Sequence, residues 1–141
     1  MGRGEPTDLR DPVRRGLRGI ARPAISIAEP GANADRDRSI VFSGDTAPAD
    51  AVVEACNACD VLIHEVYSQA GFDTLPPDDR KYHAAFHTSA PELAALATRA
   101  RAKTLVLHHQ LFFGQTESEL VDEVKRGFRG NVVSAHDLQT L

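Results

Sequence analysis

Residues 39–46 read Ser-Ile-Val-Phe-Ser-Gly-Asp-Thr, a short apolar run that ends in an aspartate. Similar runs lead into polar side chains at residues 61–65 (Val-Leu-Ile-His-Glu) and 104–109 (Thr-Leu-Val-Leu-His-His). Short apolar runs of this kind are typical of buried strands, and helical patterns separate the three of them. The alternation of strands and helices predicts a parallel sheet and an α/β fold.

The polar residues that follow these runs are expected to lie close together. In an open parallel sheet, ligands bind in the crevice outside the carboxyl ends of the strands. The residues that this rule places there are Asp45, His64, Glu65, His108 and His109. The sequence therefore predicts a binding or catalytic site at this edge of the sheet.

The composition fits one small domain. The chain has 141 residues, 42% of them hydrophobic, and a formal net charge of −4. This balance gives no general attraction to nucleic acid or anionic lipid, but it neither supports nor excludes an RNA substrate. No apolar stretch approaches the roughly 18 residues of a membrane span, and no apolar run follows the first basic residues. We therefore expect a cytoplasmic protein.

Residues 1–38 differ from the rest of the chain. They carry 8 basic and 6 acidic residues, with Gly and Pro scattered among them and no sustained apolar period. From Ser39 onward the chain carries 8 basic and 14 acidic residues. We interpret residues 1–38 as an irregular Arg- and Gly-rich arm and residues 39–141 as the domain.

Three helices and a fourth strand complete the expected domain. Thr46 can cap a first helix that runs to about Cys59. Residues 89–92 and 116–119 fit capping boxes, and apolar residues at helical spacing follow each of them. A short strand is expected at residues 131–134.

Cys56 and Cys59 are the only cysteines. Two cysteines are too few for a disulfide framework or for a four-cysteine zinc site. A reactive pair normally lies at the start of a helix, where the helix dipole lowers the thiol pKa, whereas this pair lies near a helix end. We therefore expect ordinary packed thiols.

The placement of the histidines indicates a metal site. All six fall at expected strand ends or in the polar stretch from Ser68 to about Thr88, which contains Pro76-Pro77-Asp78-Asp79 and is expected to form a long loop. They are His64, His83, His87, His108, His109 and His136. Imidazole and carboxylate together favour zinc or a similar divalent metal, and two such metals can share a hydroxide nucleophile.

Four motifs in this order resemble the C-terminal half of the metallo-β-lactamase fold, and most closely its ribonuclease Z and arylsulfatase-like branch. The motifs are Ser43-Gly44-Asp45-Thr46, Ile63-His64-Glu65-Val66, His87-Thr88-Ser89 and Leu105-Val106-Leu107-His108-His109. The resemblance covers about Ser39 to Leu141. It implies half of an αββα sandwich, in which one β-sheet carries helices packed on one face.

The resemblance also implies roles for five residues. Asp45 matches the aspartate that bridges two zinc ions, and His109 matches the last histidine ligand, on the second zinc. His87 matches a histidine that stabilises or protonates the leaving group. His64 and Glu65 match the pair that supports this histidine. No role follows for His83, His108 or His136.

The chain departs from the family in its first part. The family's first half should supply a His-x-His-x-Asp-His motif and a further histidine ligand, but residues 1–38 contain no histidine. At most Asp45 and His109 then bind metal directly, whereas a catalytic zinc normally takes three protein ligands. We expect a truncated or misframed gene product, or a second polypeptide that supplies the missing half.

The leading hypothesis is a zinc-dependent hydrolase, in which a metal-bound water cleaves a phosphodiester, sulfate or acyl ester. A small ester is preferred to RNA because we find no extended RNA-binding arm. The alternative is a metal-free, inactive half-domain that acts as a binding or assembly module or is an unstable fragment. A nucleotide-binding domain is disfavoured because no Gly-rich loop follows an expected strand.

A half-fold should expose a sheet face of roughly several hundred Å², which predicts self-association or a complementing N-terminal half.

Overall fold

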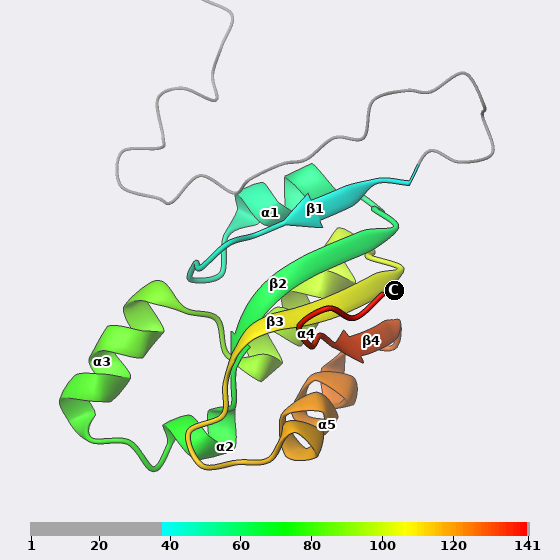
Figure 1. Cartoon of the computed structure of the whole chain (residues 1–141). Helices are drawn as coiled ribbons and strands as arrows, with labels where there is room; N and C mark the ends of the chain where they lie inside the picture. Colours follow the sequence, from blue (N-terminus) through cyan, green and yellow to red (C-terminus); the bar gives the residue numbers. More distant parts are fainter. Residues whose placement is uncertain (1–37, 141) are drawn as a thin grey trace, which may run out of the picture.

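The computed structural model describes residues 38–140 (Figure 1). The expected arm, apart from Arg38, lies outside the described residues. Strands and helices follow one another in the order β1 (Ile40–Phe42), α1 (Asp50–Cys56), β2 (Val61–Tyr67), α2 (Gln69–Phe72), α3 (Pro77–Phe86), α4 (Ala90–Ala100), β3 (Thr104–Leu111), α5 (Glu117–Gly127) and β4 (Asn131–Ser134).

The four strands form one sheet in the order β1-β2-β3-β4, and every neighbouring pair is parallel. Each strand therefore pairs with the next one along the chain through a crossover that contains at least one helix. Crossovers between parallel strands are almost always right-handed, so successive crossovers in one direction place their helices on the same face. The predicted parallel α/β fold with helices on one face is confirmed.

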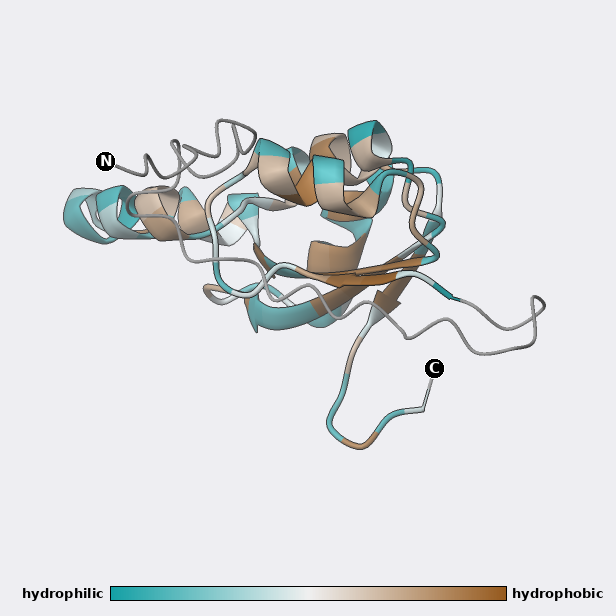
Figure 2. Ribbon diagram, turned by 90° about the horizontal axis from the view of Figure 1, so that it is seen from above, coloured by the Kyte–Doolittle hydropathy of each residue, from teal (hydrophilic) through white to brown (hydrophobic). Residues whose placement is uncertain are grey.

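The hydrophobic core lies between the sheet and the helices α1, α4 and α5, which Figure 2 shows on one side of the sheet. Alternate strand residues point into this layer because side chains alternate across a strand. The largest fully buried apolar side chains of this core are Leu62, Leu93, Leu105, Leu107, Leu120, Val52, Val66 and Val124. Within residues 38–140, no helix combines the length and the apolar character that a bilayer span requires.

Both predicted capping boxes are confirmed. The Ser89 hydroxyl accepts a hydrogen bond from the Glu92 amide at the start of α4, and the Glu92 carboxylate accepts one from the Ser89 amide at 3.0 Å. Thr116 and Glu119 make the same reciprocal pair at α5. The predicted cap of α1 is wrong, because the Thr46 hydroxyl donates to the carbonyl of its neighbour, and α1 begins only at Asp50.

The predicted long loop from Ser68 to about Thr88 is also wrong, because most of it is helical. The Ser68 hydroxyl caps α2 by accepting from the Gly71 amide at 3.1 Å. Pro76 and Pro77 begin α3, at the helix start where a missing N–H removes no intrahelical hydrogen bond. The prolines therefore mark the start of a helix, which also contains His83.

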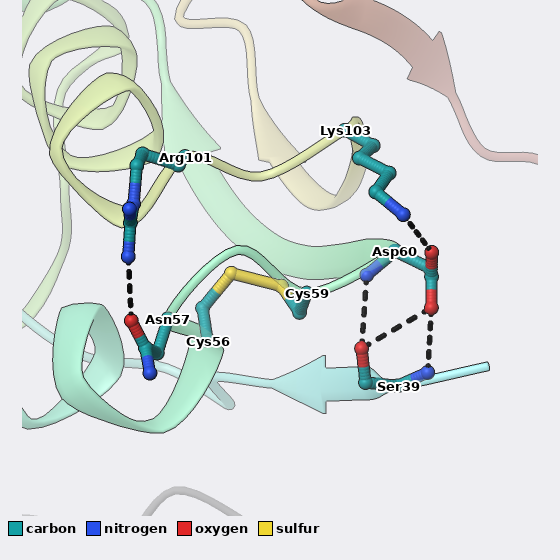
Figure 3. The surroundings of a disulfide bond; sticks show 7 residues. All are labelled: Ser39, Cys56, Asn57, Cys59, Asp60, Arg101 and Lys103. Atoms are coloured by element: carbon teal, nitrogen blue, oxygen red, sulfur yellow. Dashed lines mark hydrogen bonds and ion pairs between the residues drawn. A yellow bond between two sulfur atoms is a disulfide. The ribbon is translucent and has the colours of Figure 1, made fainter. Parts of the chain in front are cut away.

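Cys56 and Cys59 form a disulfide, so the prediction of free packed thiols is wrong (Figure 3). Directly after α1, Asn57 and Ala58 adopt positive φ angles of 35° and 71°. These two residues reverse the chain and bring the Cα atoms of the cysteines to 4.7 Å. Helix position alone led us to expect thiols, whereas the turn that follows the helix decides the pairing.

The opposite face of the sheet carries an apolar row. Strand register aligns Phe42 with Ile63, Ile63 with Val106, and Val106 with Val133. These side chains alternate with those of the helix-covered core and so lie on the other face. In Figure 2 the segment after β4 extends on this side, and α1, α4 and α5 do not. The sheet is therefore a single layer with helices on one face. On the other face Val106 is buried among its neighbours, whereas Phe42, Ile63 and Val133 are half-buried.

We expect this apolar row to mediate self-association. The double substitution of Ile63→Thr and Val133→Thr keeps β-branched residues but removes apolar surface, so it should shift sedimentation velocity toward the monomer. Val132→Thr, on the core side of the same strand, is the control and should lower the melting temperature without reducing association. A wild-type chain that sediments as a monomer at all concentrations would contradict this expectation.

Candidate metal centre

Polar side chains from four segments meet at the carboxyl edge of the sheet. The first belongs to the loop after β1, the second to β2, the third to the residue that ends α3, and the fourth to β3. They are Asp45, Glu65, His87 and His109. His87 thus lies at the end of a helix, whereas the other three lie in a strand or in the loop directly after one.

The loop after β1 turns sharply at Gly44. The Ser43 amide still donates to the Ile63 carbonyl at 3.0 Å, so pairing with β2 continues one residue beyond the strand. Gly44 then takes a φ of +63°, a left-handed conformation that a residue without Cβ adopts at little cost. The next residue is Asp45, and its Oδ1 atom lies 3.5 Å from Nδ1 of His109.

A β-bulge positions His109. In the register of β2 and β3, Glu65 pairs with His108 and Val66 with Gln110, so His109 has no partner across the ladder. Its φ is 40°, and a bulged residue of this kind redirects its side chain relative to the strand. The His109 ring lies 5.5 Å from the ring of His87, with an angle of 24° between the planes.

Glu65 holds two loops of the site together. Its side chain is fully buried, and Oε1 accepts hydrogen bonds from the backbone amides of Thr46 at 3.2 Å and Thr88 at 2.9 Å. The Thr88 hydroxyl also donates to the Thr46 carbonyl at 2.7 Å. The loops that carry Asp45 and His87 are therefore fixed to one buried carboxylate.

The other oxygen of this carboxylate faces His87. Oε2 of Glu65 lies 3.4 Å from Nδ1 of His87, and both atoms are buried without a hydrogen-bond partner. Burial raises the pKa of Glu65 to about 8, against the lowering effect of its two backbone hydrogen bonds. Burial and the nearby His109 lower the pKa of His87. Two buried atoms without a hydrogen-bond partner therefore face each other here, Oε2 of Glu65 and Nδ1 of His87.

Glu65, His87 and His109 each place one ligand atom within 4.8 Å of the other two. Nitrogen and oxygen donors of this kind can hold a divalent metal, and Asp45 lies beside the group, 3.5 Å from His109. From the sequence we expected only Asp45 and His109 as direct ligands. Glu65 and His87 were expected in the site as partners of each other. The helix end that carries His87 and the bulge that carries His109 were not predicted.

The structure does not bring His64 into this cluster. The His64 side chain is buried, and its Nδ1 lies 2.7 Å from the carbonyl oxygen of Glu65. Burial lowers the pKa of His64 to about 4, so its ring is neutral at physiological pH. Of the two residues expected to support His87, Glu65 is therefore the one that lies beside it.

The remaining histidines lie around the centre or away from it. His108 packs its ring 4.6 Å from that of Phe42, and burial lowers its pKa. His83, in α3, lies 5.5 Å from the ring of His87. His136 contacts Glu117 on the surface at 3.1 Å. None of these three belongs to the group of ligand atoms found in residues 38–140.

Comparison with known proteins identifies relatives of this chain. No family model matches it. The ribonuclease Z of Haloarcula marismortui is 38% identical over 103 residues, which are 71% of this chain and 30% of the relative. The ribonuclease Z of Bacillus subtilis is 37% identical over 105 residues, 72% of this chain and 32% of the relative. That of Halobacterium salinarum is 31% identical over 136 residues, 95% of this chain and 38% of the relative.

A solved structure agrees with these relatives. The metallo-β-lactamase fold protein YhfI of Bacillus subtilis matches with a TM-score of 0.54 and 25% identity over 70% of this chain and 37% of that protein. The homologues are thus ribonuclease Z, and the fold corresponds to part of the metallo-β-lactamase fold, as the sequence motifs predicted. The chain spans about a third of the length of the curated relatives that it matches.

Replacing Glu65 should separate its structural role from its charge. Glu65→Ala leaves two buried amides, of Thr46 and Thr88, without an acceptor, which should cost about 2–4 kcal/mol in the free energy of unfolding. Glu65→Gln keeps the acceptor oxygen and should cost less than about 1 kcal/mol. Urea denaturation of the metal-free chain measures both, and equal losses for the two variants would contradict this role.

Proposed function

We propose that this chain contributes one part of the active site of a zinc-dependent hydrolase related to ribonuclease Z. The observation that supports this most directly is the meeting of Asp45, Glu65, His87 and His109 at one edge of the sheet. In this proposal Asp45 and His109 are metal ligands. The further ligands come from polypeptide outside residues 38–140, in line with relatives of which the matched segment is about a third.

The donor set fits zinc. Imidazole nitrogen and carboxylate oxygen are the usual ligands of zinc when thiolates are absent. Buried polar atoms normally have hydrogen-bond partners, but Oε2 of Glu65 and Nδ1 of His87 have none. Contacts made in the complete active site would explain why these atoms are left free. The metal-free assembly module, which we considered from the sequence, offers no such reason. When bound, the metal supplies a Lewis acid and lowers the pKa of water.

His87 is the proposed proton donor or charge stabiliser for the leaving group. Its ring lies between Glu65 and His109, 3.4 Å from the carboxyl oxygen of the first and 5.5 Å from the ring of the second. A carboxylate beside one ring nitrogen fixes the orientation of an imidazole and stabilises its protonated form. Glu65 then positions His87, and His64 holds the backbone carbonyl of Glu65. Glu65 thus links the protonation of His87 to the two loops.

The relatives support an RNA phosphodiester as the substrate, in place of the small ester that we preferred from the sequence. The proteins that match this chain carry the name ribonuclease Z. The alignment with the Halobacterium salinarum protein also extends into the segment before Ser39, because it spans 95% of this chain. The boundary near residue 38 remains a prediction.

Zinc binding by the chain should depend on His109. His109→Ala removes a proposed ligand and should weaken zinc binding at least about tenfold in isothermal titration calorimetry of chelator-stripped protein. His136→Ala is the matched control, because His136 is an exposed histidine paired with Glu117 away from the centre. Wild-type zinc affinity in His109→Ala, or equal weakening in the two variants, would contradict the site.

Hydrolysis should require a complementing part. We expect this chain, mixed with the remaining two thirds of the Bacillus subtilis ribonuclease Z, to cleave a 3′-extended RNA or bis(p-nitrophenyl) phosphate in the presence of zinc. His87→Ala should then lower the rate about 10²- to 10⁴-fold, as for the loss of a general acid, and His136→Ala should leave it unchanged. A rate that His87→Ala does not alter would contradict the proposed role of His87.

A further inference from the structure

Helix α3 places two large aromatic side chains in solvent beside the candidate centre. None of its ten residues is buried, and Figure 1 shows it at the margin of the molecule, away from the layer formed by α1, α4 and α5. Tyr82 is 57% exposed and Phe86 is 55% exposed. A surface helix normally turns such residues toward a core, so a pair left in solvent indicates a binding surface.

The exposed rings connect directly to the candidate centre. The ring centroids of Tyr82 and Phe86 are 5.1 Å apart, and that of Tyr82 is 6.4 Å from that of His87. The His87 ring in turn lies 5.5 Å from that of His109. The four rings thus form a row from the surface of α3 to a proposed metal ligand, so a group bound on Tyr82 would lie near the proposed proton donor His87.

The rest of the fold holds α3 in this position. The His83 ring packs at 4.7 Å from the ring of Phe113, in the segment after β3, and meets Tyr82 edge to face at 5.2 Å. Phe113 lies 6.1 Å from the buried Tyr67 of β2. The His87 amide donates to the His83 carbonyl at 2.9 Å. The exposed pair is therefore attached to the sheet through packed rings and is preorganised for binding.

Charged side chains of both signs accompany the aromatic pair. Lys81 is exposed next to Tyr82 and Arg80 precedes it, while Asp78 and Asp79 lie in the first turn of the same helix. Neither Lys81 nor Arg80 forms an ion pair with a residue in the part of the chain that the structure describes. A ligand that stacks on Tyr82 and carries a phosphate would meet both an aromatic surface and a cation.

We propose that Tyr82 and Phe86 form a stacking platform for a planar ring of the substrate, adjacent to the bond that is cleaved. The proposal rests on the proposed hydrolase function, and it names the substrate class as esters of phosphate that carry a planar ring. Stacking on an aromatic side chain is tolerant of the kind of ring, so a nucleobase and a simple aryl group share this chemistry. The continuity of the ring row with His87 favours a substrate ring over a protein partner.

The test uses the full chain, because it contains only two tyrosines and no tryptophan. With ¹³C-labelled tyrosine, the ring signals of Tyr82 and of the buried Tyr67 are followed by NMR during titration with AMP, phenyl phosphate or ribose 5-phosphate. We expect AMP and phenyl phosphate to shift the Tyr82 signal and leave Tyr67 unchanged. Ribose 5-phosphate, which has no planar ring, should shift neither. Tighter binding of AMP identifies a nucleobase, and tighter binding of phenyl phosphate identifies an aryl ester.

Variants distinguish the platform from the fold. Tyr82→Ala and Phe86→Ala should each weaken AMP binding about tenfold, measured from the AMP ring protons, whereas Tyr82→Phe keeps the ring and should bind within about twofold of wild type. Leu138→Ala removes an exposed apolar side chain outside α3 and serves as the control. Because α3 buries no residue, the melting temperatures of the variants should be unchanged.

Two results would overturn the platform. One is equal binding of AMP and ribose 5-phosphate, with no shift of the Tyr82 signal. The other is a Tyr82 signal that shifts with protein concentration without ligand, because α3 would then be a contact between copies of the chain. Ring binding needs neither zinc nor turnover. A failure of hydrolysis with intact AMP binding thus overturns the proposed function. Hydrolysis without AMP binding overturns only the platform.

Discussion

The buried carboxylate of Glu65 is the interaction on which the site depends. It accepts backbone hydrogen bonds from Thr46 and Thr88, which lie 19 and 23 residues away in the sequence. A carboxylate in so buried a position is stable only if its oxygens are satisfied or it stays protonated. One oxygen meets this requirement with the two loops, and the other faces His87. The same residue thus fixes the backbone of the site and leaves one atom for its chemistry.

The sheet and the site are incomplete on corresponding sides. The helices cover one face, and the apolar row that includes Ile63 and Val106 lies on the other. The candidate centre likewise gathers only a few donors from residues 38–140. The matched segment is about a third of the length of the curated relatives, and the proposed function assigns the further ligands to polypeptide outside residues 38–140.

Helix α3 and the strands contribute different kinds of residue to the site. The strands and the loop after β1 contribute the proposed ligands Asp45 and His109, which the sheet holds rigidly. The helix contributes His87 at its end and the exposed rings of Tyr82 and Phe86 along one side. Metal binding and substrate contact are therefore assigned to separate elements, which meet where the His87 ring lies between those of Tyr82 and His109.

The sequence by itself determined the elements whose signals are local. Apolar runs gave the four strands and their parallel order, and the capping boxes at Ser89 and Thr116 gave the starts of α4 and α5. The tertiary structure alone decided the bulge at His109, the hydrogen bonds that join Glu65 to Thr46 and Thr88, and the disulfide of Cys56. These features depend on strand register, on a turn after a helix and on residues about twenty positions apart. No local pattern encodes such contacts, because their free energy comes from packing the folded chain.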